Sequence, residues 1–120
     1  MNRHRDLVAW QVCRHLASEC YRATRSFPAP ERYGLTSQIR RAAVSTAENI
    51  AEGNARLGAK ELAHGLSIAL GSLAELDTLF AVAEDLGYLA GNELAALEAL
   101  RVRASQLIFG LQRRTRKLDK

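Results

Sequence analysis

Proline and long apolar runs are scarce in this sequence. Its 120 residues contain two prolines and eight glycines, which excludes collagen-like and low-complexity proteins. No uninterrupted apolar stretch approaches the roughly 18 residues that a membrane span requires. The charged start of the chain, Met1 to Asp6, has no apolar segment behind it. We therefore expect no signal peptide, no membrane contact and a cytoplasmic location.

Cysteine is also rare, and the two cysteines are placed where they cannot pair with each other. Cys13 and Cys20 are seven residues apart on one expected helix, so their Cα atoms are separated by about 10.5 Å, whereas a disulfide needs about 7 Å or less. We expect both to be buried, reduced thiols.

With 48% hydrophobic and 25% charged residues, the chain is expected to fold as one domain, residues 1–120, without metal or disulfide.

Residues that favour helices dominate the composition. The chain has 20 Ala and 18 Leu, while β-branched residues are few, so an all-α fold is predicted. Apolar residues recur at alternating steps of three and four in four segments, which is the spacing of bundle seams. The four stripes are Ala9, Cys13, Leu16, Cys20, Ala23 and Phe27; Ile39, Ala43, Thr46, Ile50 and Gly53; Leu62, Leu66, Ala69, Leu73, Leu76, Phe80 and Ala83; and Leu97, Leu100, Ala104, Leu107 and Leu111.

The ends of these segments predict the topology. Pro28 and Pro30 break the first helix, Gly87 is expected as the left-handed C-terminal cap of the third, and Asn92 as the N-cap of the fourth. Because the connections are short, we predict an antiparallel up-down-up-down four-helix bundle. The third helix, residues 62–83, is apolar around most of its circumference, which favours burial against a second subunit.

The formal net charge of +4 conceals three blocks of opposite sign. Residues 1–60 carry a net charge of +5, residues 61–100 carry −7 with no Lys or Arg, and residues 101–120 carry +6. This pattern favours either a basic surface for a polyanion or complementary surfaces that pair with each other.

Motifs for catalysis and metal binding are incomplete. The stretch Gly53–Lys60 imitates a phosphate loop, but its lysine comes one position late and Glu61 replaces the magnesium-binding Ser or Thr. Glu61 and His64 form a single Glu-x-x-His element, whereas di-iron bundles use two. No nucleophile motif is recognisable. We expect a non-enzymatic protein with no metal and no cofactor.

The clearest basic cluster lies near the C-terminus. Basic residues at a helix end also complement the helix dipole, so this cluster has a structural explanation as well. Fourteen Arg against three Lys suits bidentate phosphate contacts. No pattern for base recognition is present, so any binding to RNA or DNA should occur through the backbone. The candidate residues are Arg101, Arg103, Arg113, Arg114, Arg116 and Lys117.

Polar residues also recur at helical spacing along the second helix and part of the third. Three interpretations are open: a solvated face, a functional surface, or an interhelical network in which Arg41 lies near Glu75. The residues are Gln38, Arg41, Ser45, Asn49, Glu52 and Arg56 in the second helix, and Ser72 and Glu75 in the third.

A set of residues spread over nearly the whole chain forms a familiar pattern, whose most specific part is the run Asn49-Ile50-Ala51-Glu52-Gly53. Its other members are Asp6-Leu7, Trp10, Tyr21, Phe27-Pro28, Glu31-Arg32-Tyr33-Gly34-Leu35, Gln38, Arg41-Ala42, Ser45, Leu66-Ser67-Ile68-Ala69, Gly71-Ser72 and Glu75-Leu76. In this order they resemble the four-helix bundle proteins encoded in intervening sequences of 23S ribosomal RNA genes. One departure is Ala47, where that family usually has proline, so a kink there is not expected.

The resemblance implies a cytosolic bundle that assembles into a ring-shaped homopentamer, without an established biochemical activity. The chain is also similar to accessory proteins of diversity-generating retroelements, which bind nucleic acid and a reverse transcriptase through basic surfaces. We therefore expect a ring-forming bundle that binds nucleic acid through phosphate contacts. The alternative is a scaffold oligomer whose charge blocks serve subunit assembly or a protein partner.

Overall fold

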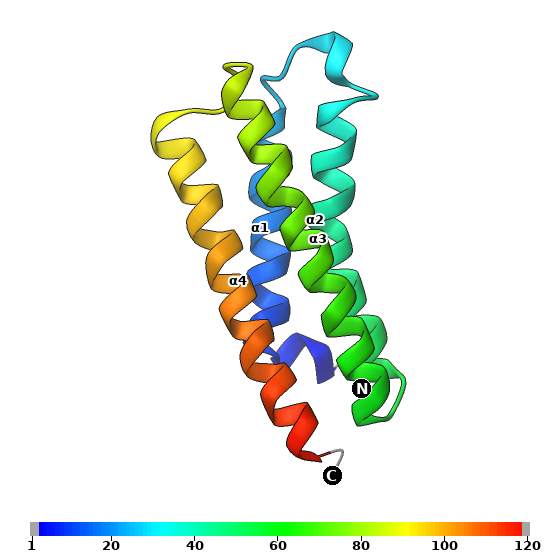
Figure 1. Cartoon of the computed structure of the whole chain (residues 1–120). Coiled ribbons are helices and arrows are strands. Elements are labelled where there is room, and N and C mark those ends of the chain that lie inside the picture. The colour runs from blue at the N-terminus through cyan, green and yellow to red at the C-terminus, as the bar shows by residue number, and fades with distance from the viewer. Residues whose placement is uncertain (1–2, 119–120) are drawn as a thin grey trace.

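Four long helices form the computed structural model, which describes residues 3–118 (Figure 1). Two short 3-10 turns accompany them, and no strand occurs within this described range. The prediction of an all-α four-helix bundle is confirmed. The elements are η1 (Arg3–Asp6), α1 (Val8–Thr24), η2 (Ala29–Glu31), α2 (Leu35–Ala55), α3 (Ala59–Asp85) and α4 (Gly91–Leu118).

Each helix packs against its two neighbours around the bundle, α1 with α2, α2 with α3, α3 with α4 and α4 with α1. In Figure 1 the colour gradient reverses direction from each helix to the next. The contacts between α2 and α3 indicate the same opposite direction for this pair of helices. Gly53 meets Gly65 near one end, and the earlier residue Ser45 meets the later residue Ser72 further along. The bundle measures 48 × 22 × 20 Å, so its long faces offer most of the surface available to a partner.

The core consists of the predicted stripes, with small shifts in α4. Every stripe residue of the first two segments is buried, and in the third all are buried except the half-buried Leu62. In α4, Leu100 and Leu107 are only half-buried, whereas Ile108 is fully buried and was not predicted. Thr115 continues this buried face and satisfies its hydroxyl by donating to the Leu111 carbonyl at 2.7 Å.

Of the two helix caps predicted from the sequence, one is confirmed and the other is wrong. The Gly87 cap is confirmed: its φ is +78°, the Tyr88 amide donates to the Ala83 carbonyl, and the Gly87 amide donates to the Glu84 carbonyl. These two bonds satisfy carbonyls that the helix itself leaves free. The Asn92 cap is wrong, because Gly91 turns the chain with a φ of +57° and α4 already begins there, which places Asn92 inside the first turn.

Helix α3 is long and apolar enough to span a membrane by length and composition alone. One of its faces is fully buried in the bundle, through residues such as Leu66, Leu73, Leu76 and Phe80. A helix that is packed into the core of a bundle can be equally long and apolar, so length and composition are weak arguments for a membrane span. The apolar width of α3 leaves Ile68 and Val82 about two-fifths exposed on its outer face.

Candidate functional site

The polar face predicted along α2 divides into a linked centre and exposed flanks. At the centre, the hydroxyls of Ser45 and Ser72 lie 3.0 Å apart and join α2 to α3. The Asn49 amide donates to the Ser45 carbonyl at 2.8 Å and to the Ser45 hydroxyl at 2.9 Å. All three side chains are half-buried, so this cluster fixes the register of the two helices.

Of the three open interpretations of this polar face, the one that pairs Arg41 with Glu75 is wrong for this pair. Both side chains are exposed, and no ion pair joins them within residues 3–118. The reason is geometric, because the close approach of the helices falls on the Ser45 side of the face, while Arg41 and Glu75 point into solvent. Gln38 and Glu52 are exposed as well. The polar residues of the family pattern on α2 and α3 therefore divide into one interhelical network of three side chains and four side chains that face solvent.

Two glycines allow the backbones of α2 and α3 to touch below this network. A Cβ added at Gly53 would lie 3.0 Å from the Glu61 carbonyl oxygen, and one added at Gly65 would overlap the Asn49 carbonyl oxygen and lie 3.1 Å from the Gly53 Cα. Both glycines lie inside helices and neither has a positive φ, so the requirement is for space rather than for backbone freedom. Asn-Ile-Ala-Glu-Gly ends in glycine because a neighbouring helix occupies the side-chain position.

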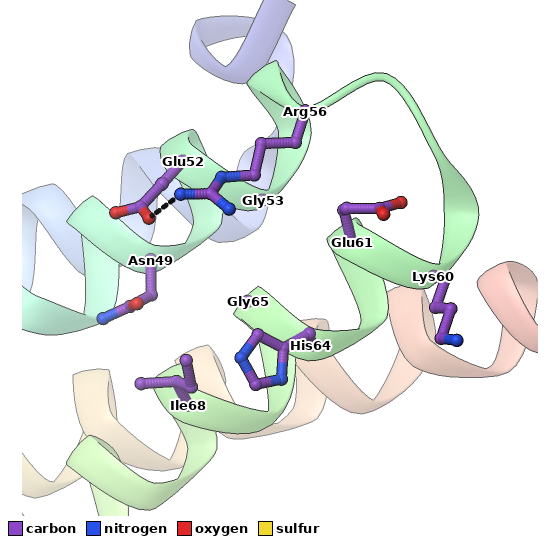
Figure 2. Close-up of a pocket in the computed structure, with 9 residues that line it drawn as sticks. All are labelled: Asn49, Glu52, Gly53, Arg56, Lys60, Glu61, His64, Gly65 and Ile68. Atoms are coloured by element: carbon purple, nitrogen blue, oxygen red, sulfur yellow. Dashed lines mark hydrogen bonds and ion pairs between the residues drawn. The ribbon is translucent and has the colours of Figure 1, made fainter.

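An open cleft of about 470 Å³ lies over this glycine contact (Figure 2). Asn49 and Glu52 come from α2, Arg56 is the residue that follows the last turn of α2, and His64 and Ile68 come from α3. Glu52 is paired with Arg56 at 3.0 Å.

The predicted Glu-x-x-His element also lines this cleft, with Glu61 and His64 exposed. In the part of the chain that the structure describes, no three His, Cys, Asp or Glu side chains gather to hold a metal. Lys60 adds a further charge to the same cleft. The lining therefore mixes both signs and selects neither anions nor cations.

The six candidate cations near the C-terminus do not form one set. Arg101 is bound to Glu98 at 2.7 Å and to Asp77 at 3.4 Å, its side chain is 16% exposed, and the hydrogen bond to Glu98 raises its pKa further. It is thus engaged in holding α4 to α3. The five exposed cations have no carboxylate within 4.0 Å among residues 3–118; they are Arg103, Arg113, Arg114, Arg116 and Lys117.

Both cysteines are buried and unpaired, as predicted. Burial raises the pKa of Cys13 to about 11 and that of Cys20 to about 12. A thiol that stays protonated is a poor nucleophile, so neither cysteine has the environment of a reactive residue.

The sequence profile of the 23S rRNA-intervening sequence proteins matches residues 5–110. The chain belongs to this family. No curated protein matched the sequence. In this intervening-sequence protein the match covers the Ser45 network and the glycine contact, whereas Arg113, Arg114, Arg116 and Lys117 follow the matched range.

Sequence reasoning about this intervening-sequence protein missed a second basic surface, on α1 and α2. Trp10, Arg14 and Tyr21 on α1 and Arg25 at its C-cap follow at steps of 4, 7 and 4, so they share one face. That spacing was visible in the sequence, but the apolar stripe of the same helix gave the stronger signal. The pairing of Arg101 was also foreseeable, because Glu98 stands three residues before it.

Proposed function

We propose that this protein is a non-enzymatic, ring-forming helical bundle that binds nucleic acid through phosphate contacts. The observation that supports this proposal is that five exposed cations lie between residues 103 and 117 and have no carboxylate partner in the described chain. Unpaired arginines bind phosphate without first breaking an ion pair, and their planar donors fit two phosphate oxygens at once. Such contacts carry no base information, so binding is sequence-tolerant.

Assembly into a ring is the second part of the proposal. Large apolar side chains remain about two-fifths to one-half exposed on the outer faces of α3 and α4, among them Ile68, Val82, Val102 and Phe109. Burying such side chains between subunits removes apolar surface from water. Together with the family resemblance, this supports a homopentamer of single-domain subunits with a formal charge of about 5 × (+4) = +20.

The competing proposal is a scaffold oligomer whose charges serve assembly or a protein partner. The contact of Arg101 with Asp77 favours it, because here a cation of the basic C-terminal block is neutralised by the acidic block between residues 61 and 100. If the remaining cations meet acidic groups of a neighbouring subunit in the same way, no basic surface is left for phosphate.

The two proposals separate in a binding experiment. Fluorescence anisotropy of labelled RNA and DNA, single- and double-stranded, is measured at low salt for the parent and for a variant with Arg113, Arg114 and Arg116 replaced by Ala. Arg56→Ala is the control, because this exposed arginine is already paired with Glu52. We expect the triple variant to weaken binding of every sequence alike and the control to bind like the parent.

Light scattering after gel filtration gives the second readout. The parent and the triple variant should both elute at about five times 13.2 kDa. A monomer mass at micromolar concentration contradicts the ring. If no nucleic acid binds below about 100 μM, the upper limit typical of non-specific contacts, the scaffold proposal is preferred.

A further inference from the structure

Helices α1 and α2, with the connecting segment that holds Arg25 and Arg32, form two adjoining clefts that lie outside the C-terminal basic cluster. The first, of about 660 Å³, is lined by Trp10, Arg14 and Tyr21. The second, of about 480 Å³, is lined by Arg32 and Arg40. The clefts share Arg25, so they form one continuous surface along the two helices, called here the α1–α2 face.

Positive charge dominates the α1–α2 face. Glu48 is the single carboxylate among the described residues that line the two clefts. Arg14, Arg25 and Arg40 have no carboxylate within 4.0 Å in residues 3–118, unlike Arg22, which is held by Glu19 at 2.6 Å on the margin of the same face. A concave surface lined by one sign of charge raises the local concentration of a ligand of the opposite sign.

Two aromatic rings stand among these arginines. Trp10 and Tyr21 are eleven residues apart, which is three turns and about 16 Å along α1. The Trp10 ring is half-buried, with the guanidinium groups of Arg5 and Arg14 within 5.2 and 5.6 Å of its centroid. Tyr21 is 43% exposed, and the Arg40 guanidinium lies 4.5 Å from its centroid.

The position of Arg40 is fixed by α1 as well as by the tyrosine ring. Its Nε donates to the Thr24 hydroxyl at 2.9 Å, and its terminal nitrogen donates to the Tyr21 carbonyl at 3.3 Å. Tyr21 and Arg40 therefore form a preorganised stacked pair that bridges the two helices. A flat ring that stacks on this pair requires no rearrangement of either side chain.

Between the aromatic rings, the wall of the first cleft is made of small apolar side chains. Ala17 comes from α1, and Ala47 and Ala51 come from α2. These alanines offer an apolar surface to the flat face of a ring, and the polar side chains Ser18 and Glu48 line the same cleft. The arginines on either side supply the contacts for charged groups.

We infer that the α1–α2 face is a binding site for single-stranded nucleic acid, with unpaired bases stacked at Tyr21 and phosphates held by Arg14 and Arg25. Arginine together with exposed aromatic rings is the side-chain combination that binds single strands without sequence preference. A duplex keeps its bases stacked on each other and offers only phosphates to this face. The inference rests on the proposed nucleic-acid binding, but it assigns a different surface and a strand class.

The single tryptophan of the chain gives a direct test of location. Trp10 fluorescence is recorded while a 20-nucleotide single-stranded RNA of mixed sequence, and a duplex of equal length, are added to the full chain at low salt. We expect the single strand to quench Trp10 and the duplex to leave its emission nearly unchanged. Anisotropy of the same labelled oligonucleotides reports the affinities in parallel.

Variants at Tyr21 test the stacking contact. Tyr21→Ala should weaken single-strand binding roughly fivefold to a hundredfold, the range for loss of one base–aromatic contact. Tyr21→Phe should stay within about twofold of the parent, because the ring is retained. Tyr33→Ala is the control, since Tyr33 is 88% exposed and does not line either cleft.

Arg25→Gln tests the phosphate contact separately from the ring. It should lower the dependence of log affinity on log salt by about 0.7, the value for one phosphate contact of a single strand. Circular dichroism melts establish that each variant remains folded, which the exposure of these side chains leads us to expect.

Four results overturn the inference. The α1–α2 face is not the site if duplex and single strand bind equally and Tyr21→Ala has no effect. It is also not the site if binding leaves Trp10 emission unchanged. In both cases the proposed function stands. If Tyr21→Ala or Arg25→Gln changes the mass in solution, this face is a contact between subunits. If no nucleic acid binds at all, the inference and the proposed function fail together.

Discussion

The glycine contact between α2 and α3 makes Gly65→Ala the most informative single change in the fold. A methyl group at this position would overlap the Asn49 carbonyl oxygen and lie 3.1 Å from the Gly53 Cα. The obstructing atoms are backbone, so no side chain can rotate away. Because carbon atoms pack best at about 3.5–4.0 Å, the helices must separate by roughly half an ångström or more.

The expected cost follows from two opposing contributions. Overpacking of a close contact destabilises by about 1–3 kcal/mol, and rigid backbone atoms favour the upper end of that range. Replacing a helical glycine by alanine stabilises by about 1 kcal/mol. The net loss for Gly65→Ala is therefore about 2 kcal/mol in the free energy of unfolding. For a chain of 120 residues this lowers Tm by about 8 °C, since 1 kcal/mol corresponds to roughly 4 °C at this size.

Gly71→Ala in the same helix is the matched control. A Cβ at Gly71 meets nothing within 4 Å, so only the helix-propensity gain remains and Tm should rise by about 2–4 °C. Thermal melts followed by circular dichroism, at one protein concentration because the chain is expected to associate, measure both shifts. A Gly65→Ala protein as stable as the parent would refute the direct contact of the two backbones.

Two further predictions concern the polar face and the thiols. Glu75→Ala should change the free energy of unfolding by less than about 1 kcal/mol, because Glu75 and Arg41 are exposed and unpaired with each other; a urea midpoint showing a loss of several kcal/mol would contradict this. Folding raises the pKa of Cys13 to about 11 and of Cys20 to about 12, from 9.0. Their contribution to stability is complete below pH 9 and declines as the pH rises through 9 toward 11–12, by roughly 1.4 kcal/mol per thiol for each pH unit. Urea midpoints at pH 8 and pH 10 should show this decline, and in Cys20→Ala about half of it; an unchanged midpoint would contradict burial of the thiols.

The sequence predicted features that depend on neighbours along one helix. The cap at Gly87 needs only local backbone geometry, and the buried stripes need only helical spacing. The Asn92 cap failed because Gly91 allowed the helix to begin earlier. Leu107 and Ile108 are adjacent, and only the rotation of α4 against its neighbours decides which of them is buried.

The candidate site was less predictable, because it depends on how the helices meet. The pair of Arg101 with Glu98 is local, but its second partner, Asp77, comes from α3 and depends on how the helices meet. Ser45 and Ser72 are 27 residues apart, and their hydrogen bond required the register of α2 against α3. The pairing of Tyr21 with Arg40 likewise joins two helices, which no spacing along one segment reveals.

The salt dependence of nucleic-acid binding tests the central claim most directly. Affinity of the parent for duplex RNA and for single-stranded RNA, measured by anisotropy between about 50 and 200 mM salt, should fall linearly on logarithmic axes. Replacing Arg113, Arg114 and Arg116 by Ala should reduce that slope by about 2–3, which is three contacts at 0.7 to 0.9 each. The account is contradicted if the parent shows no salt-dependent binding, or if the triple variant keeps both the affinity and the slope of the parent.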